Sequence, residues 1–447
     1  MTAAAEVRQE NESLREQVRW QQEKINWLQE RLLLLQQQEI LREELQQQVD
    51  LLKDQVQALQ DQLKKDSHNS HRPPSSDRFH RQPKSLRVER RQVIDLPIKR
   101  VQVIEHQAQQ KCCPTCQQIS SAAFPENVSA PVQYGAAFGA VGVYLVQQQL
   151  LPYERACEVM QDLLGPSMSE KTLQSLVQRC AQQLCPVEEQ IKAALARAAV
   201  LHQDETGLYV AGKRHWMHVS ATERLTHYAV HAKRGHDALD AIGILTDFHG
   251  VSVHDGWQAY WRYACEHGLC NVHHLRELIF LYEVLQQAWA AQMKDLLLDM
   301  KAAVDQARAE GRKALHSLEV ADWKTRYGAV LQEGYLANPP DPPPQVSKKG
   351  RRKQSPARNL LDRLSTHQDA VLAFLDNFAV PFDNSLAERD IRMVKVQQKV
   401  SGCFRSASGA QAFARIRGYL STLRKQGIPV LTALEQALVG HPVFPVF

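Results

Sequence analysis

Apolar residues recur at helical spacing through residues 8–65 of the chain. They form two blocks at intervals of three and four, and the second block is displaced by three residues from the register of the first. The blocks are Leu14, Val18, Ile25, Leu28, Leu32 and Leu35, then Leu45, Val49, Leu52, Val56, Leu59 and Leu63. No Gly or Pro interrupts them. The pattern predicts a coiled coil over residues 1–66, locally overwound where the register changes, and therefore a homo-oligomer. The alternative is a long amphipathic helix packed on its own domain.

A polar segment separates this helix from the rest of the chain. Residues 67–92 are rich in Pro, Ser, Arg and His, a composition that buries no core, and we interpret them as a basic linker. Residues 93–125 begin with a β-rich, partly alternating stretch, Val93–Glu105, and then contain three closely spaced cysteines.

Residues 126–195 show helical periodicity with two clear helix starts. One helix begins at Pro152–Arg155, and Ser167–Lys171 supplies the cap of another. Short capped helices suit a helix-turn-helix-like DNA-binding region, and the same pattern fits any small helical bundle.

From residue 196 the pattern changes to short apolar strands. We expect strands at residues 198–203, 216–221, 228–231, 250–254 and 269–272, with a helix at 237–245. Strands followed by strand–helix alternation predict a mixed α/β sheet, whose first part is residues 196–273. Residues 274–358 interrupt it with helices over 274–335 and a basic, Pro-rich loop over 338–352. Residues 359–447 complete the domain, with helices expected at 360–378 and 384–397.

Composition sharpens this picture in two ways. The net charge of +5 is mild, but basic residues collect in 72–100, 348–363 and 389–425, and three such patches favour nucleic acid as a partner. Nine cysteines do not form the framework of a secreted scaffold, and neither a signal peptide nor an apolar run of membrane-spanning length is present. We therefore expect a cytoplasmic protein with no membrane partner.

Two aspartates stand where predicted strands end. Asp204 follows the strand at 198–203, and Asp255 follows the strand at 250–254. Carboxylates from two strand ends can face each other at the rim of a sheet, and a divalent cation relieves their repulsion. Hard oxygen ligands suit Mg²⁺ or Mn²⁺. A turn or helix-capping role is the alternative for either residue.

Glu388 is the third candidate carboxylate. Asp383 or Asn384 is a suitable cap for the helix that carries it. On that helix Arg392, Lys395 and Lys399 follow Glu388 at i+4, i+7 and i+11, and so share its face. Such a stripe can hold a phosphate backbone, and it can equally be a surface helix with simple ion pairs. The spacing alone leaves this open.

Five segments together resemble the IS66 family of bacterial insertion-sequence transposases. They are DETG (204–207), HDGW (254–257), CNVHHLREL (270–278), NSLAER (384–389) and KVSGCFRS (399–406). The resemblance runs from about residue 90 to the C-terminus. The coiled coil followed by PPSSD (73–77) is also similar to that family.

The resemblance implies an RNase H-like DDE domain with an all-α insertion between the second Asp and the Glu. Asp255 lies 51 residues after Asp204, and Glu388 lies 133 residues after Asp255, which leaves room for the insertion. It further implies two Mg²⁺ or Mn²⁺ ions, bridged by Asp204 and each completed by Asp255 or Glu388, for cleavage and joining of DNA. The residues expected to bind DNA are Arg389, Arg392, Lys395, Lys399 and Arg405.

The implied partners are DNA, as terminal inverted repeats and target, and helper proteins encoded by the element. The implied location is the bacterial nucleoid. Two other readings stay open. One is a hydrolytic nuclease that does not join strands, and the other is a catalytically defective DNA-binding remnant.

The family also implies a zinc segment before the catalytic domain. Cys113 and Cys116 resemble its second half, so they are the candidate Zn²⁺ ligands. The upstream cysteine pair is absent, and only His106 and Cys112 lie nearby, which favours an internally truncated module. Cys270 and His273 also have ligand-like spacing, but we interpret His273 as a polar group near the rim of the active site.

Overall fold

The computed structural model describes residues 46–57, 101–126, 128–340 and 354–447. The chain divides into two units, Met1–Pro97 and Ile98–Phe447. In the first unit, residues 46–57 are helical, and the apolar side chains of Val49, Leu52 and Val56 are exposed. The rest of the predicted coiled coil over 1–66, and the predicted linker over 67–92, lie outside the described residues. None of the described helices is both long enough and apolar enough to cross a bilayer.

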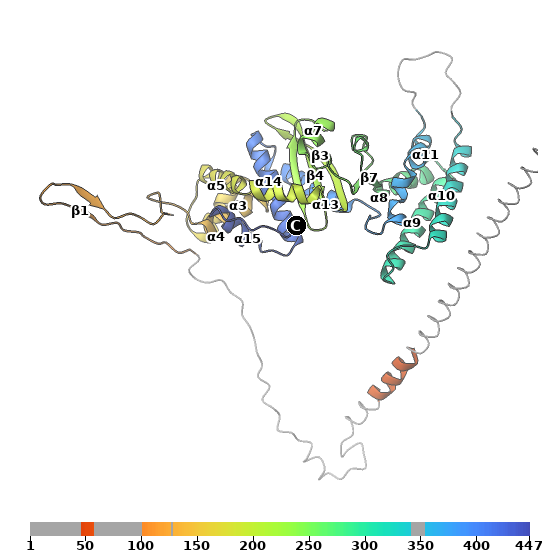
Figure 1. Ribbon diagram of the computed structural model, residues 1–447, viewed down its shortest axis with the longest axis horizontal. Helices are drawn as coiled ribbons and strands as arrows, with labels where there is room; N and C mark the ends of the chain where they lie inside the picture. Colours follow the sequence, from red (N-terminus) through yellow and green to blue (C-terminus); the bar gives the residue numbers. More distant parts are fainter. Residues whose placement is uncertain (1–45, 58–100, 127, 341–353) are drawn as a thin grey trace, which may run out of the picture. The chain divides into compact units, whose positions relative to one another are not determined.

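The second unit is built around a five-stranded mixed sheet (Figure 1). Its strands are β3 (Val200–Val210), β4 (Lys213–Ala221), β5 (Thr226–His231), β6 (Val251–His254) and β7 (Glu266–Leu269). They are ordered β5-β4-β3-β6-β7; β3, β4 and β5 are antiparallel, whereas β6 and β7 run parallel to β3. The tight β3–β4 turn contains Ala211 and Gly212, both with positive φ, as a two-residue hairpin of this twist requires. The predicted mixed α/β class is confirmed.

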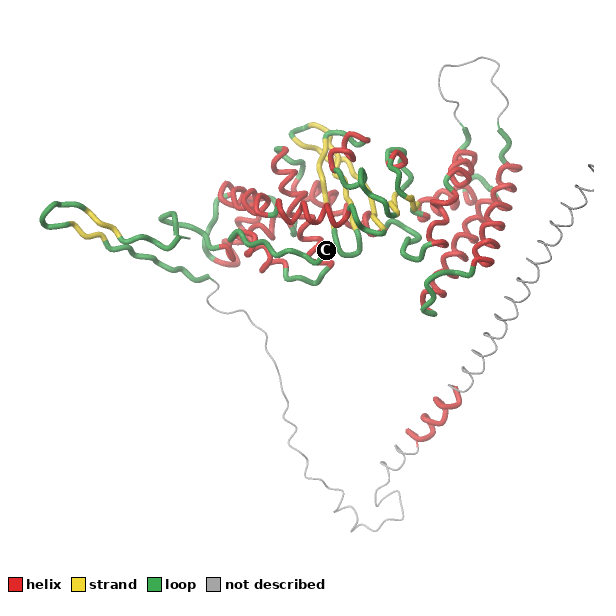
Figure 2. Tube along the Cα trace, viewed as in Figure 1, coloured by secondary structure: helices red, strands yellow, loops and turns green. Residues whose placement is uncertain are grey.

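Helices cover both faces of the sheet (Figure 2). Side chains alternate along a strand, so Leu208 and Met217 lie on one face, where they pack against α13 (Ser385–Ser401) and α14 (Ala407–Lys425). On the other face Leu201 packs with residues of α6 (Cys185–Leu195) and α7 (His236–Ile242). We call these the α13 face and the α7 face.

Two groups of helices flank the sheet. The first contains α3 (Ala136–Gln147), α4 (Tyr153–Leu164), α5 (Glu170–Gln183), α6 and the C-terminal α15 (Val430–Leu438). The predicted starts are confirmed, because Pro152 precedes α4 and the Ser169 side chain accepts a bond from Thr172 N at the start of α5. A short hairpin of β1 (Gln110–Cys112) and β2 (Ile119–Ser121) precedes this group.

The second group is a helical insertion with a core of its own, and it extends beyond the predicted bounds of 274–358, because residues 360–375 pack into the same core. Its helices are α8 (Asn271–Glu283), α9 (Ala288–Ala309), α10 (Ser317–Ala337), α11 (Pro356–Thr366) and α12 (Gln368–Asp376). The α12 helix contacts β7 and so joins this group to the sheet. Residues 341–353 of the predicted basic loop lie outside the described part.

Several predicted boundaries were wrong. β3 continues seven residues beyond Gln203, to Val210, because residues 204–210 pair with β4 although Asp204–Gly207 interrupt the apolar run. The strand predicted at 269–272 ends at Leu269, and Asn271 starts α8 while its backbone N–H donates to Phe382 O.

Other predictions fail in the same way. The helix predicted over 360–378 is broken at His367 into α11 and α12. Of the stretch predicted to be β-rich, 93–105, residues 101–105 are described and have no regular structure. The strands of the wider segment 93–125 are β1 and β2, which come after that stretch.

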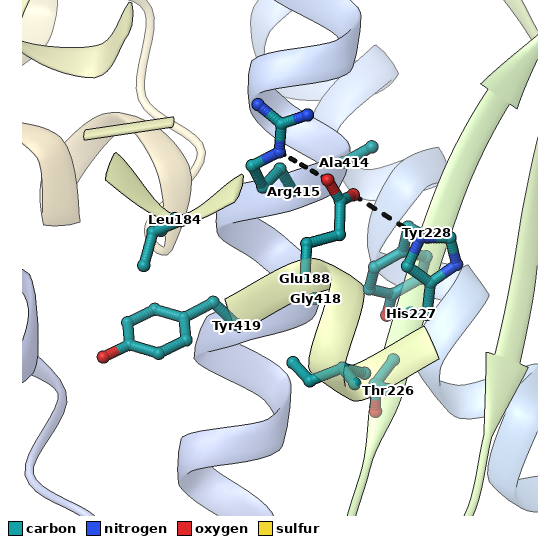
Figure 3. A pocket seen from close by; sticks show the side chains of 10 residues that line it. Leu184, Glu188, Thr226, His227, Tyr228, Ala414, Arg415, Gly418 and Tyr419 are labelled. Carbon is teal, nitrogen blue, oxygen red and sulfur yellow. Dashed lines mark hydrogen bonds and ion pairs between the residues drawn. The ribbon is translucent and has the colours of Figure 1, made fainter. Parts of the chain in front are cut away.

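A partly buried ion pair holds the first helical group to the sheet (Figure 3). Glu188 of α6 accepts a bond from Arg415 Nε of α14 at 2.5 Å and lies 3.4 Å from His227 Nε2 of β5. Burial raises the pKa of Glu188, but the bonds to His227 and Arg415 outweigh burial and leave the pKa below its usual value. The carboxylate therefore stabilises the junction of three elements in its ionised form.

We predict that Glu188→Gln lowers the free energy of unfolding by about 2 kcal/mol at pH 7, because Arg415 loses its partly buried counter-charge. The exposed neighbour Glu189→Gln is the matched control and should change stability by less than about 0.5 kcal/mol. Because the pKa of Glu188 is lowered in the folded state, its contribution is present above the unfolded pKa and lost as pH falls through the folded pKa. Urea denaturation at pH 7 and in acid measures this. Equal effects of the two variants at pH 7 would contradict it.

Candidate active site

The register of the two central parallel strands places Asp204 beside Asp255. His202 of β3 pairs with Val253 of β6, and each aspartate lies two residues further along its strand direction. Residues two apart in a strand point to the same face, so Asp204 belongs with His202 to the α13 face. Asp255, the first residue after β6, lies close enough for its charge to raise the pKa of Asp204. The sequence predicted that Asp204 ends its strand, but Asp204 lies inside β3. It stands beside the end of the parallel partner strand β6. Asp255 follows β6 directly and is exposed.

The next strand places Cys270 at the same edge. His254 pairs with Leu269 of β7, and Cys270 N donates to His254 O at 3.0 Å. Asp204, Asp255 and Cys270 thus follow one another across three neighbouring parallel strands. Of these residues Asp255 is exposed, Asp204 is half-buried and Cys270 is buried.

Glu388 reaches this edge on the first turn of α13, which Asn384 anchors. Asn384 Nδ2 donates to Gln203 O at 2.7 Å, and Asn384 Oδ1 lies 2.9 Å from His202 Nδ1. Its backbone N–H donates to Cys270 Sγ at 3.2 Å. The side chain of Asn384 is therefore bonded to the sheet and does not cap the helix, and Asp383 Oδ1 accepts from Ser385 N instead. Of the two predicted caps, Asn384 occupies the N-cap position without a side-chain cap bond, and Asp383 precedes it.

Glu388 contacts two further side chains that could bind a metal. Its Oε1 lies 3.7 Å from Cys270 Sγ and 3.8 Å from His273 Nδ1. Among the described residues, the ligand atoms that gather within 4.8 Å of one another belong to this set of Cys270, His273 and Glu388. The spacing of Cys270 and His273 was visible in the sequence, but their proximity to Glu388 depends on a helix 118 residues after Cys270.

The pKa of Asp204 is raised by its surroundings. Burial raises its pKa most, and the neighbouring carboxylates of Glu205, Asp255 and Glu388 raise it further, to about 7. The backbone N–H of Glu205 donates to Asp204 Oδ1 at 2.8 Å and offsets only part of this. The carboxylates of Asp204, Glu205, Asp255 and Glu388 therefore repel one another here. Burial also raises the pKa of Cys270 to about 11, so its thiol stays protonated.

Glu205, the acid next to Asp204, points to the α7 face and is neutralised there. Arg234 donates to Glu205 Oε1 through Nε at 2.9 Å and through Nη2 at 2.5 Å, and Tyr260 Oη donates to Oε2 at 2.5 Å. Sequence analysis missed this cluster. Strand alternation separates Glu205 from Asp204, but the partners lie 29 and 55 residues away in sequence and no local pattern marks them.

The basic residues predicted to bind DNA lie on or just after α13. Arg389, Arg392 and Lys399 are exposed on the helix, and Arg405 is exposed in the loop that follows it. Within the described part of the chain, these four make no ion pair with a carboxylate. Lys395 differs, because its Nζ donates to Gly207 O at 2.8 Å and ties α13 to β3.

The candidate zinc ligands occupy the hairpin of β1 and β2. Cys113 and Cys116 lie in its connecting turn, and their thiols are free. Hydrogen bonds from the backbone of Cys116 and of Thr115 lower the pKa of Cys113 to about 7, which favours the thiolate form that metals bind. The hairpin thus presents two thiols at its turn.

We predict that Asp204→Asn raises the melting temperature at pH 8 in the presence of a chelator. The pKa of Asp204 is raised in the folded state, so the folded chain holds more protons than the unfolded chain between pH about 4 and 7. Stability attributable to this group is therefore full in acid and lost as pH rises through 7. The expected gain is about 2–4 °C for each kcal/mol of repulsion removed, and it should disappear near pH 4.

Differential scanning calorimetry at both pH values measures this gain. Asp247→Asn, at an exposed turn, is the control and should change neither value. A destabilised Asp204→Asn at pH 8 would show that the carboxylate is not under repulsion.

Comparison with known proteins agrees with this geometry. The model of the transposase IS66 family matches residues 131–412, which include the sheet, the helical insertion and all three carboxylates. No curated protein matches the chain. Because the match spans more than half of the sequence, this chain belongs to the transposase IS66 family, and it is a DNA-acting enzyme.

Proposed function

We propose that this transposase cleaves the ends of an insertion sequence and transfers the cleaved strands to target DNA, using Asp204, Asp255 and Glu388 as a metal-binding triad. The observation that carries the proposal is the register of β3 and β6, which sets Asp255 beside Asp204, and Asp204 lies on the face from which α13 presents Glu388. The strand order, three antiparallel strands followed by two parallel ones, supports an RNase H-like class for this domain.

The donor set fits Mg²⁺ or Mn²⁺. Three carboxylates offer hard oxygen ligands, and the raised pKa of Asp204 reflects repulsion that a divalent cation would relieve. Two such ions, when bound, supply Lewis acidity that activates water or a DNA 3′-hydroxyl and neutralises charge at the phosphorus. Asp204, Asp255 and Glu388 are the residues that would hold them.

The protein's own contribution is positioning. Asn384 fixes the first turn of α13 against β3 and Cys270, so Glu388 approaches Asp204 at a set distance from the sheet. The protonated thiol of Cys270 donates to Glu388 Oε1, which orients the carboxylate without adding a negative charge. Preorganisation of this kind lowers the cost of assembling charged groups around a phosphate.

Exposed cations beside the triad supply the DNA contact that we propose. Arg389, Arg392 and Lys399 occupy the same helix as Glu388, and Arg405 follows it. Guanidinium and ammonium groups without a carboxylate partner are free to bind phosphates. The affinity for DNA that such contacts give is independent of DNA sequence and sensitive to salt.

Two further proposals concern the N-terminal part. The exposed apolar side chains of Val49, Leu52 and Val56 keep the spacing of a coiled-coil seam, which supports homo-oligomerisation through residues 1–66. The lowered pKa of Cys113 supports Zn²⁺ binding by Cys113 and Cys116 with ligands from elsewhere. Terminal inverted repeats, target DNA and helper proteins of the element complete the proposed set of partners.

The triad predicts a specific loss of chemistry. Asp204→Asn, Asp255→Asn and Glu388→Gln should each abolish both nicking and joining of labelled element ends in Mg²⁺, by at least about a hundredfold, while DNA affinity stays near that of the parent. An amide keeps the size of the carboxylate and loses the charge that holds the ion. Double variants should lose no more than single ones, because the residues act as a unit.

Asp247→Asn is the matched control and should retain both products. Joined products distinguish a transposase from a nuclease that only nicks. Near-parental joining by any one triad variant would remove that residue from the triad.

A further inference from the structure

Four side chains on the α7 side form an alternating series of guanidinium groups and indole rings, which we call the arginine–tryptophan ladder. Arg214 Cζ lies 4.8 Å from the ring centroid of Trp216, and Arg234 Cζ lies 4.9 Å from the same ring. Arg234 Cζ also lies 4.2 Å from the ring centroid of Trp257. All three distances are within the range of cation–π attraction.

The ladder adjoins the candidate triad. Trp257 N donates to Asp255 Oδ1 at 2.8 Å, so the last ring belongs to the loop that carries a triad carboxylate. Arg234 binds Glu205, the residue after Asp204. At its other end the ladder lies over Gly207 of β3, which pairs with Trp216. Because Gly207 has no side chain, Arg214 can approach the strand closely; a Cβ on Gly207 would lie 3.4 Å from Arg214 Nη2.

The inner part of the ladder is rigid and its outer part is open. Arg234 is held by two bonds to a carboxylate with only 2% of its side chain exposed, and by the rings on either side. Arg214 is exposed, and within the described residues it has no carboxylate partner. Trp216 and Trp257 are half-buried, so part of each indole remains open to solvent.

Indole faces held beside unpaired guanidinium charge are suited to unpaired nucleotides. The rings stack on a base, and the cations bind its phosphate. In a duplex each base is already stacked between its neighbours, so a paired strand would use the cations and leave the rings unused. The sign of the charge, the planar rings and the proximity to Asp255 all favour a DNA strand with unpaired bases over a protein partner.

We propose that the arginine–tryptophan ladder binds an unpaired nucleotide of the DNA strand that lies at the triad. This inference rests on the proposed function and adds a specific subsite to it. The ladder acts in binding, with Trp216 as the stacking platform and Arg214 as the phosphate contact, while Arg234 keeps the rings in place through Glu205.

The test compares two DNAs of equal duplex length, one blunt and one with a single-stranded thymidine 3′ extension. Binding to the full chain is followed by fluorescence anisotropy in a chelator, so that no cleavage occurs. The parent should bind the extended DNA more tightly than the blunt DNA. Trp216→Ala should lose about tenfold in affinity for the extended DNA and little for the blunt DNA, whereas Trp216→Phe should keep most of the preference.

The chain offers two matched controls. Arg326 lies over Trp323 on α10 in the same type of contact, at 4.4 Å, so Arg326→Ala removes an equivalent pair within the helical insertion and should leave both affinities unchanged. Arg392→Ala removes a proposed phosphate contact of α13 and should weaken both DNAs alike.

The remaining outcomes distinguish failure of the ladder as a stacking site from failure of the proposed transposase function. If Trp216→Ala weakens both DNAs equally, or neither, the ladder is not a stacking site and the inference is overturned, while the triad stands. Should Trp216→Ala fail to fold, Trp216→Leu, which keeps apolar volume without an aromatic face, must lose the preference for the extended DNA, and an unchanged preference in that variant overturns the inference. A parent chain that binds neither DNA overturns the proposed function as well.

Discussion

The side-chain amide of Asn384 joins parts of the chain that lie more than a hundred residues apart, and the candidate site is built around it. Its NH₂ group donates to Gln203 O, so its carbonyl oxygen is the acceptor that faces His202, and His202 must carry its proton on Nδ1. Its backbone N–H is bonded to Cys270 Sγ. All these groups are buried, so an unmade bond would cost the full desolvation of its partner. The helical insertion can therefore interrupt the chain without loosening the position of Glu388.

Strand alternation divides the charge of β3 between two faces. Asp204 faces α13, where other carboxylates raise its pKa to about 7, and Glu205 faces α7, where Arg234 and Tyr260 bind it. One acid is thus left under repulsion that a metal can relieve, while the next is neutralised by the protein. The same alternation puts the arginine–tryptophan ladder behind β3 and next to Asp255, which links the proposed strand-binding subsite to the proposed metal site.

Local patterns were sufficient for elements that carry their own signals. Ser169 caps α5 and Pro152 precedes α4, as expected from the preferences of helix termini, and the apolar run before Asp255 forms β6. Local sequence patterns failed where a segment's structure depends on another segment of the chain that pairs with it or packs against it. The middle of β3, Asp204–Gly207, has no large apolar side chain and is a strand because β4 pairs with it, and Asn271 starts a helix where apolar neighbours suggested a strand. The contacts of Cys270 and Glu205 likewise depend on residues distant in sequence.

If Asp204, Asp255 and Glu388 hold divalent ions, the full chain takes up Mn²⁺ through these three carboxylates. Electron paramagnetic resonance reports the free ion during a titration. The account predicts that Asp204→Asn, Asp255→Asn and Glu388→Gln each weaken Mn²⁺ binding by more than about tenfold. Cys270→Ser and His273→Gln should keep it, since a protonated thiol is a poor ligand for this hard ion. Parental affinity in Asp204→Asn and Asp255→Asn, together with loss in Cys270→Ser and His273→Gln, would contradict the account and assign the ion to Cys270, His273 and Glu388.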